Sequence, residues 1–275
     1  MKQLRPISLV ILTTRHSVNR GLIDELSQKH RIKGIVFEDQ KRLRARLFIR
    51  RLRARGLLEV LDQILFKILE LLILSSRTGR KVEGACSSCE SFQRTRFGET
   101  EVLETRSVNS QEVLSLIPRT KPDMVVVSGT SILDGNLLSA LGSIPVINIH
   151  CGITPRYRGA HGGFWAIVND DWDNVGTTVH FIDSGIDTGN IIAQRNIEVE
   201  PNDTPQDLAS KQHTMGAILA VKAIASIAGG HLQTVNREDL DSRFYSSPTL
   251  TAYLRYRKNL RKRFSSMESG KSSPG

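Results

Sequence analysis

Two polar side chains stand at the end of an apolar, β-prone stretch, in the order Asn148-Ile149-His150. Alternation along a strand places Asn148 and His150 on the same side, so an amide and an imidazole converge on one point. Asp187 lies downstream in a glycine-containing loop that follows a second apolar stretch, and a bent loop can bring its carboxylate back over this point. Such a set can donate hydrogen bonds and move a proton.

The elements that must position these groups alternate between strands and helices. Strands are predicted at residues 7–13, 31–37, 102–105, 123–128, 144–149, 176–182 and 190–199. Helices are predicted at residues 18–30, 111–117, 133–141, 160–169 and 204–228, the last with Thr204 as its N-cap and Pro205 at its first position. This alternation predicts an α/β fold with a Rossmann-like, open and mostly parallel sheet. Strand C-termini in such sheets face the ligand crevice, which is where Asn148 and His150 are expected.

Residues 39–98 interrupt this alternation and are interpreted as a basic, helical insertion. The segment 41–55 carries eight Lys and Arg residues, and a long helix is predicted to follow, with its apolar side at Leu58, Leu61, Leu65, Ile68, Leu69 and Leu72. A polar, loop-like stretch then contains Cys86 and Cys89. This lone pair lacks the second ligand pair of a structural zinc site, which favours ordinary thiols over a metal site.

The net charge of +10 is concentrated in two clusters, at residues 41–55 and 255–263. The basic segment 41–55 has three interpretations: a solvated helix face, a contact with an anionic membrane surface, or a region that attracts an anionic substrate or RNA. Few aromatic residues accompany it, so nucleic acid is not favoured as a partner. A homodimer remains open. Three cysteines in 275 residues favour a reducing cytoplasm. Charged residues within the most apolar stretch, 56–74, argue against a transmembrane helix.

The ordered motifs over roughly residues 120–205 resemble the formyltransferase family that uses 10-formyltetrahydrofolate. The matching residues are Asn148 and His150, the following loop Gly152-Ile153-Thr154-Pro155, and Asp187-Thr188-Gly189. The resemblance implies a formyltransferase fold and the transfer of a formyl group from folate N10 to an amine, with no metal. Asn148 and protonated His150 are then expected to stabilise the oxyanion. Asp187 is expected to keep His150 charged and to relay a proton.

The resemblance also suggests binding residues. Ser131, Ile132 and Leu133 are expected to line the pterin slot, and the backbone of the loop that contains Asp183 and Gly185 to bind the pterin edge. Residues from 158 to 165 are expected to face the acceptor, with Arg158, Gly159, His161 and Trp165 as the candidates.

Three further polar residues near these motifs need an interpretation. Asp183 is the rival of Asp187 for the carboxylate role. His180 either supports the site or simply packs. Cys151 is interpreted as structural, because the chemistry needs no thiol.

The resemblance leaves the acceptor amine open. The glycinamide ribonucleotide enzyme of this family has a glycine-rich phosphate loop after its first strand, whereas Thr13-Thr14-Arg15 stands here without glycine. We expect residues 1–230 to form the catalytic domain. Residues 231–275 form a short extension with a disordered end, too short for the C-terminal barrel of the tRNA enzyme. An amino sugar, or another small amine of specialised metabolism, is therefore favoured. A formyltetrahydrofolate hydrolase and a non-catalytic folate-binding protein are the alternatives.

Overall fold

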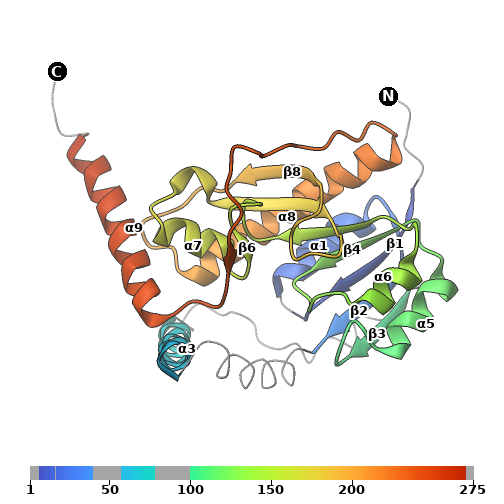
Figure 1. Cartoon of the computed structure of the whole chain (residues 1–275), viewed down its shortest axis with the longest axis horizontal. Helices are drawn as coiled ribbons and strands as arrows, with labels where there is room; N and C mark the ends of the chain where they lie inside the picture. Colours follow the sequence, from blue (N-terminus) through green and yellow to red (C-terminus); the bar gives the residue numbers. More distant parts are fainter. Residues whose placement is uncertain (1–5, 16, 40–56, 78–99, 271–275) are drawn as a thin grey trace.

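A seven-stranded sheet forms the centre of the computed structural model, which describes residues 6–15, 17–39, 57–77 and 100–270 (Figure 1). Its strand order is β3-β2-β1-β4-β5-β7-β8. The strands span β1 Ser8–Thr13, β2 Arg31–Glu38, β3 Glu101–Thr105, β4 Met124–Ser128, β5 Val146–His150, β7 Gly176–Phe181 and β8 Ile191–Asn196. Strands β1 to β5 are all parallel, and β7 is antiparallel to both β5 and β8. The predicted α/β fold with a mostly parallel sheet is confirmed.

Helices cover both faces of the sheet. They span α1 Ser17–Ser27, α3 Leu57–Arg77, α5 Gln111–Thr120, α6 Gly135–Leu141, α7 Gly162–Val168, α8 Pro205–Ala228 and α9 Leu250–Gly270, with a short 3-10 helix at Trp172–Asn174. Leu9 and Ile11 of β1 pack in the cluster with α1 and α8, whereas Val10 and Leu12 pack in the cluster with α5 and α6. Both faces of this central strand are therefore buried, which is why its sequence is continuously apolar.

Helix α8 begins where the sequence predicts. The Thr204 hydroxyl accepts a hydrogen bond from the amide of Asp207, and the Asp207 carboxylate accepts one from the amide of Thr204. This reciprocal capping box satisfies two amides at the start of the helix, and Pro205 occupies its first turn.

The C-terminal extension packs on the domain through α9. Tyr256 of α9 is fully buried and stacks on Phe164 of α7, with ring centroids 5.1 Å apart. The Asn259 amide donates to the backbone carbonyls of Ile167 and Val168. The sequence predicts disorder for about the last dozen residues; α9 continues to Gly270, and residues 271–275 lie outside the described residues.

Helix α3 lies against α9 with Asp62 and Phe66 on its inward side. Phe66 is buried, with its ring centroid 5.7 Å from that of Tyr253, and Asp62 accepts hydrogen bonds from Thr251. Five of the six residues on the predicted apolar side are exposed: Leu58, Leu61, Leu65, Ile68 and Leu72. The basic segment 41–55 and the pair Cys86 and Cys89 lie outside the described residues.

Candidate active site

Strand β5 delivers Asn148 and His150 to its C-terminal end, as the sequence predicts. Asn148 lies opposite Val127 of β4 on one side and His180 of β7 on the other. His150 is buried, with 6% of its surface exposed. Because β7 runs antiparallel to β5, it places His180 directly beside the Asn148 amide.

Asp187 reaches this point from the loop between β7 and β8. Its Oδ2 atom accepts a hydrogen bond from the amide of Gly159 at 2.8 Å and lies 3.4 Å from Nδ1 of His150. Its Oδ1 atom accepts from the Asn148 amide at 3.3 Å. The backbone of Asp187 is left-handed, with φ of +52°, a conformation that Asp tolerates better than most residues. The structure therefore brings Asn148, His150 and Asp187 together.

Asp183 has a different environment. It is exposed, and it accepts hydrogen bonds from the Gly185 amide and the Thr188 hydroxyl of its own loop. Its contacts stabilise the loop that carries Asp187, so of the two rival carboxylates Asp187 is the one that touches His150.

The other ring nitrogen of His150 holds the imidazole in place. Nε2 lies 2.6 Å from the backbone carbonyl oxygen of Tyr157, and it must donate because a carbonyl only accepts. Glycine is required beside this bond: a Cβ on Gly152 would lie 2.4 Å from the same carbonyl oxygen and 2.7 Å from Nε2. Thr177 further anchors the strand end by donating its hydroxyl to the His150 carbonyl.

His180 orients the Asn148 amide. Its Nδ1 donates to the carbonyl of Phe181 at 2.7 Å, which leaves Nε2 of the neutral ring as an acceptor. Nε2 lies 3.1 Å from the Asn148 nitrogen, which donates to it. His180 is 2% exposed. It is thus a buried support of the site, and its position fixes which way the amide nitrogen of Asn148 points.

Burial and charge set the protonation of the cluster. Burial lowers the pKa of His150, although the Asp187 carboxylate and the Tyr157 carbonyl both raise it. Burial alone would raise the pKa of Asp187, but the neighbouring His150 and the hydrogen bond from the Gly159 amide lower it to about 2. At neutral pH the site therefore contains an ionised carboxylate beside an imidazole that binds a proton less readily than usual. Burial raises the pKa of the Cys151 thiol to about 12, so it is not a thiolate at neutral pH.

The loop of Ser131, Ile132 and Leu133 is held by a buried carboxylate. Glu38, at the end of β2, accepts hydrogen bonds from the amide and hydroxyl of Ser131 and from the amide of Val108. Ile132 is 62% exposed and its carbonyl accepts from Asn109, whereas Leu133 is buried in the core. The loop therefore offers one apolar side chain to solvent from a fixed backbone.

The four candidates for acceptor binding lie in different settings. Arg158 donates to the carbonyl of Ile186, and Gly159 donates to Asp187, so both support the Asp187 loop. Trp165 packs on Tyr245 and donates its indole N–H to the carbonyl of Ser246. His161 is exposed at the start of α7 with a φ of +58°.

Sequence reasoning missed the supporting residue Glu38, included Gly152 only as part of a motif, and left His180 undecided. Glu38 could have been found from its residue type, because an acidic residue at the end of an apolar strand needs hydrogen-bond partners when it is buried. The constraint on Gly152 depends on a carbonyl five residues away, and no local pattern reports it.

The described ranges contain neither a candidate metal site nor a candidate membrane span. Within them, no three His, Cys, Asp or Glu residues are grouped so that they hold a metal ion. None of the helices there has the length and hydropathy needed to cross a bilayer.

Comparison with known proteins assigns the class. The model of the formyl transferase family matches residues 76–224, more than half of the chain, and includes Asn148, His150 and Asp187. The chain therefore belongs to the formyl transferase family.

Curated relatives match over part of their length. A methionyl-tRNA formyltransferase from Chlorobium limicola is 32% identical over 150 residues, which is 54% of this chain and 46% of the relative. One from Solibacter usitatus is 33% identical over 116 residues, 42% of this chain and 37% of the relative. The chain thus matches less than half the length of these relatives.

Solved structures share the fold. A phosphoribosylglycinamide formyltransferase from Anaplasma phagocytophilum superposes with a TM-score of 0.55 at 17% identity, covering 88% of this chain and all of that one. A sugar N-formyltransferase from a Shewanella species gives 0.54 at 14% identity, covering 92% and 87%. At these identities the likeness concerns the fold alone.

Proposed function

We propose that this chain transfers a formyl group from 10-formyltetrahydrofolate to an amine. The observation that carries the proposal is the convergence of Asn148, His150 and Asp187, with His150 Nδ1 3.4 Å from Asp187 and the Asn148 nitrogen 3.3 Å from it. An amide donor, a proton-accepting imidazole and an ionised carboxylate at one strand end suit acyl transfer through an oxyanion.

Asn148 supplies the oxyanion donor. Attack of the amine on the formyl carbon forms a C–N bond and moves the carbonyl π electrons onto oxygen. One N–H of Asn148 is committed to His180, and the other makes only the longer contact with Asp187. This second N–H turns to the developing oxyanion, where such a donor contributes roughly 10²- to 10³-fold in rate.

His150 and Asp187 move the proton. The Nε2–H of His150 stays on the Tyr157 carbonyl, so Nδ1 is the nitrogen that accepts the proton from the attacking amine. Asp187 stabilises the imidazolium that forms. When the C–N10 bond breaks, the same proton passes to N10, and tetrahydrofolate and the formamide leave. The resemblance suggests that His150 acts as a cation from the start, but its lowered pKa favours a neutral ring that takes up the proton during the reaction.

The folate co-substrate fits two anchored loops. The exposed Ile132 stands on the loop that Glu38 holds, and the backbone of residues 183–187 is braced by Asp183. An apolar side chain and a rigid backbone edge are what a flat, hydrogen-bonding heterocycle needs. Ser131, Leu133 and Gly185 complete these loops.

For the acceptor we favour an amino sugar, and His161 and Arg158 are the residues that we expect to contact it. The loop after β1 gives no support to a ribonucleotide phosphate, because its Thr14 carbonyl and hydroxyl accept from the buried Asn19 amide. The second candidate is methionyl-tRNA, favoured by the names of the curated relatives.

The test is a direct assay. The full chain is incubated with 10-formyltetrahydrofolate and, separately, with nucleotide-linked amino sugars, methionyl-tRNA and water alone, while tetrahydrofolate formation is followed. Transfer to a sugar amine supports the proposal, and transfer to methionyl-tRNA selects the second acceptor. Formate release without an amine identifies a hydrolase, and folate binding without turnover a binding protein; either result overturns the transferase proposal.

A further inference from the structure

Helix α3 has its polar side toward the protein and its aliphatic side toward solvent. Asp62 binds Thr251 of α9, and Glu70 accepts from Gln206 of α8, so the acidic residues face inward. Over the residues whose side chains are described, the outward side is made of leucine and isoleucine, with the exposed Lys67 beside it. The leucines and isoleucines are Leu57, Leu58, Leu61, Ile64, Leu65, Ile68, Leu71 and Leu72.

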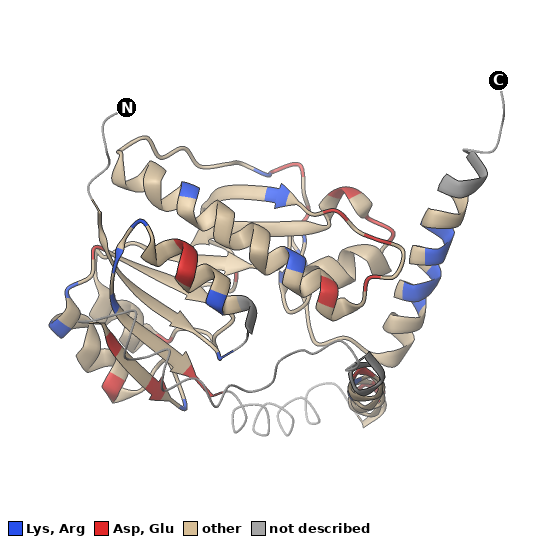
Figure 2. Cartoon of the chain, turned by 180° about the vertical axis from the view of Figure 1, so that it is seen from behind, with Lys and Arg blue, Asp and Glu red and all other residues tan. Residues whose placement is uncertain are grey.

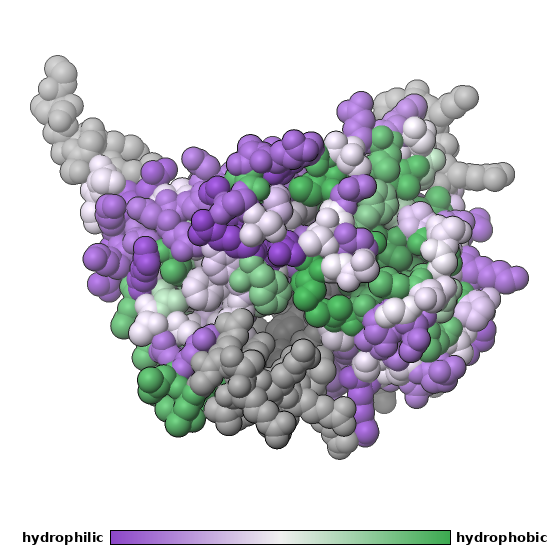
Figure 3. Space-filling model, in the orientation of Figure 1, coloured by the Kyte–Doolittle hydropathy of each residue, from purple (hydrophilic) through white to green (hydrophobic). Residues whose placement is uncertain are grey.

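This aliphatic surface is broad and continuous. At 3.6 residues per turn its positions cover an arc of roughly 140°, and within residues 57–72, whose side chains are described, no polar residue lies inside that arc. Leu58 is 83% exposed, Leu71 60%, and Leu65 and Ile68 50% each. Figure 3 shows the same side of α3 as a hydrophobic surface at the lower left, where Figure 1 places this helix. A contiguous patch of this size on a water-soluble domain marks a contact surface.

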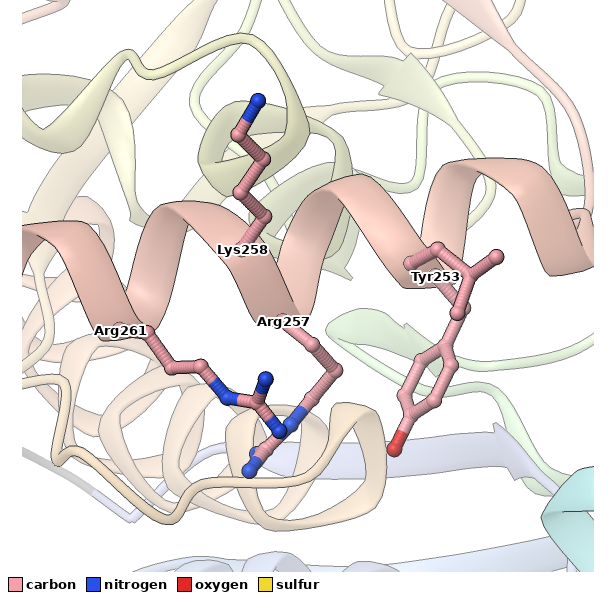
Figure 4. A pocket seen from close by; sticks show the side chains of 5 residues that line it. Tyr253, Arg257, Lys258 and Arg261 are labelled. Atoms are coloured by element: carbon pink, nitrogen blue, oxygen red, sulfur yellow. The ribbon is translucent and has the colours of Figure 1, made fainter.

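Cations border this surface. Helix α9 carries Arg255, Arg257, Lys258, Arg261, Lys262 and Arg263, and Figure 2 shows basic residues along it. A hollow of about 380 Å³ runs along α9 and is lined by Tyr253, Leu254, Arg257, Lys258 and Arg261 (Figure 4). Tyr253, at one end of this hollow, packs on Phe66 on the inward side of α3, so the hollow begins where the two helices meet.

We infer that α3 and α9 together dock the protein on an anionic lipid surface. The leucines of α3 enter the boundary between headgroups and acyl chains, and the cations of α9 attract anionic headgroups. Helix α3 itself carries more acidic than basic residues, so the attraction must come from α9.

A second protein copy fits the surface less well. Two helices that pack as a coiled coil contact each other through about two positions in every seven residues. The aliphatic arc on α3 is wider than that. Protein interfaces are also enriched in aromatic residues, Met and Arg, whereas the aliphatic arc contains none of them. Leu and Ile alone suit acyl chains, which require no specific geometry.

The test measures co-sedimentation of the full chain with vesicles of phosphatidylcholine alone or mixed with phosphatidylglycerol. We expect binding to the mixed vesicles, weakened in about 1 M salt where charges are screened. The double variant Leu61→Gln/Leu65→Gln should bind at least about tenfold more weakly, because it removes two apolar side chains from the lipid contact. Lys258→Gln/Arg261→Gln should bind about tenfold more weakly to mixed vesicles and lose the salt dependence.

The matched control is Ile218→Gln/Leu232→Gln, which changes two exposed aliphatic residues outside α3 and α9. It should bind vesicles like the parent chain, and thermal melting should show all variants folded. The inference is overturned if the parent chain does not sediment with mixed vesicles, or if the α3 variant binds as well as the control. A dimer in analytical ultracentrifugation that the α3 variant dissolves, with no vesicle binding, would instead assign this surface to a second copy.

Discussion

Nδ1 of His150 lies 3.4 Å from Oδ2 of Asp187, while Nε2 of the same ring lies 2.6 Å from the Tyr157 carbonyl oxygen. The carbonyl fixes one proton on Nε2 in both charge states of the ring. Only the proton on Nδ1 can therefore come and go, and it does so facing an ionised carboxylate. The Tyr157 carbonyl therefore orients the imidazole, and the Asp187 carboxylate stabilises the positive charge that the ring acquires.

The first prediction concerns Asp187→Asn. The amide keeps the size of the carboxylate but cannot stabilise an imidazolium, so we expect kcat to fall roughly 10²- to 10⁴-fold. Folate affinity, measured by fluorescence titration, should stay within a fewfold of the parent value. Asp183→Asn is the control, because that carboxylate is exposed and binds only its own loop in the described contacts. Equal losses of kcat in both variants would remove the special role of Asp187.

The second prediction concerns acid sensitivity. Burial lowers the pKa of His150 from 6.5, so the unfolded chain binds this proton more readily than the folded chain. The stability that the neutral ring contributes is complete above pH 6.5 and is lost as the pH falls through the lowered pKa. The ionised Asp187 stabilises the folded chain at a lower pH: its contribution is complete above 3.8, the usual pKa, and is lost as the pH falls through the lowered pKa of about 2.

Urea unfolding at pH 7 and pH 5 measures the loss of stability that protonation of His150 causes. The free energy of unfolding should fall less between these values in His150→Gln than in the parent chain. Burial also lowers the pKa of His30, and this effect is common to both proteins, so the difference between them isolates His150. The acid limb of kcat/KM should likewise lie below pH 6.5. An equal or greater loss of stability in His150→Gln would show that the buried ring does not resist protonation.

The ends of the strands can be predicted from the sequence, but the contacts between loops cannot. Alternation and valine-rich runs are local signals, and they locate β4, β5 and the convergence of Asn148 with His150. The contact of Gly159 with Asp187 spans 28 residues and depends on how two loops fold over the sheet. Helix α3 shows another limit: its leucines have helical spacing, but spacing alone does not say whether they face the core. The inward side of α3 is set by Asp62 and Phe66, whose partners are Thr251 and Tyr253 of α9.

The third prediction concerns His180, which accepts from the Asn148 amide. His180→Phe keeps a buried aromatic ring but removes the acceptor, so the amide of Asn148 loses its orientation. We expect kcat to fall about tenfold or more, with little change in the KM for folate, because the oxyanion donor acts in the transition state. His180→Gln retains a hydrogen-bonding group and should recover part of the loss. A packing role alone would instead make the Phe variant the more active of the two.

The fourth prediction concerns Glu38, which holds Ser131 and Val108. Glu38→Ala leaves their amides without this acceptor and loosens the loop that presents Ile132. The KM for folate should rise about tenfold, because Ser131 and Val108 lose the acceptor of three hydrogen bonds, while kcat stays nearly constant. Glu112→Gln, at an exposed position of α5, is the control. A lower kcat at unchanged KM would place Glu38 in the chemistry rather than in the loop.

The last prediction concerns two glycines with opposite surroundings. A Cβ at Gly152 would meet the Tyr157 carbonyl oxygen at 2.4 Å, so Gly152→Ala must push that carbonyl away from His150. We expect a loss of about 2 kcal/mol in stability, in the range typical of overpacking, and a large loss of activity. Gly21→Ala adds a methyl group where nothing lies within 4 Å, inside α1, and should stabilise the chain by roughly 0.5–1 kcal/mol. Thermal melting and the formyl-transfer assay compare the two variants. If Gly152→Ala retained parental activity, the bond from His150 to Tyr157 would not be what orients the imidazole.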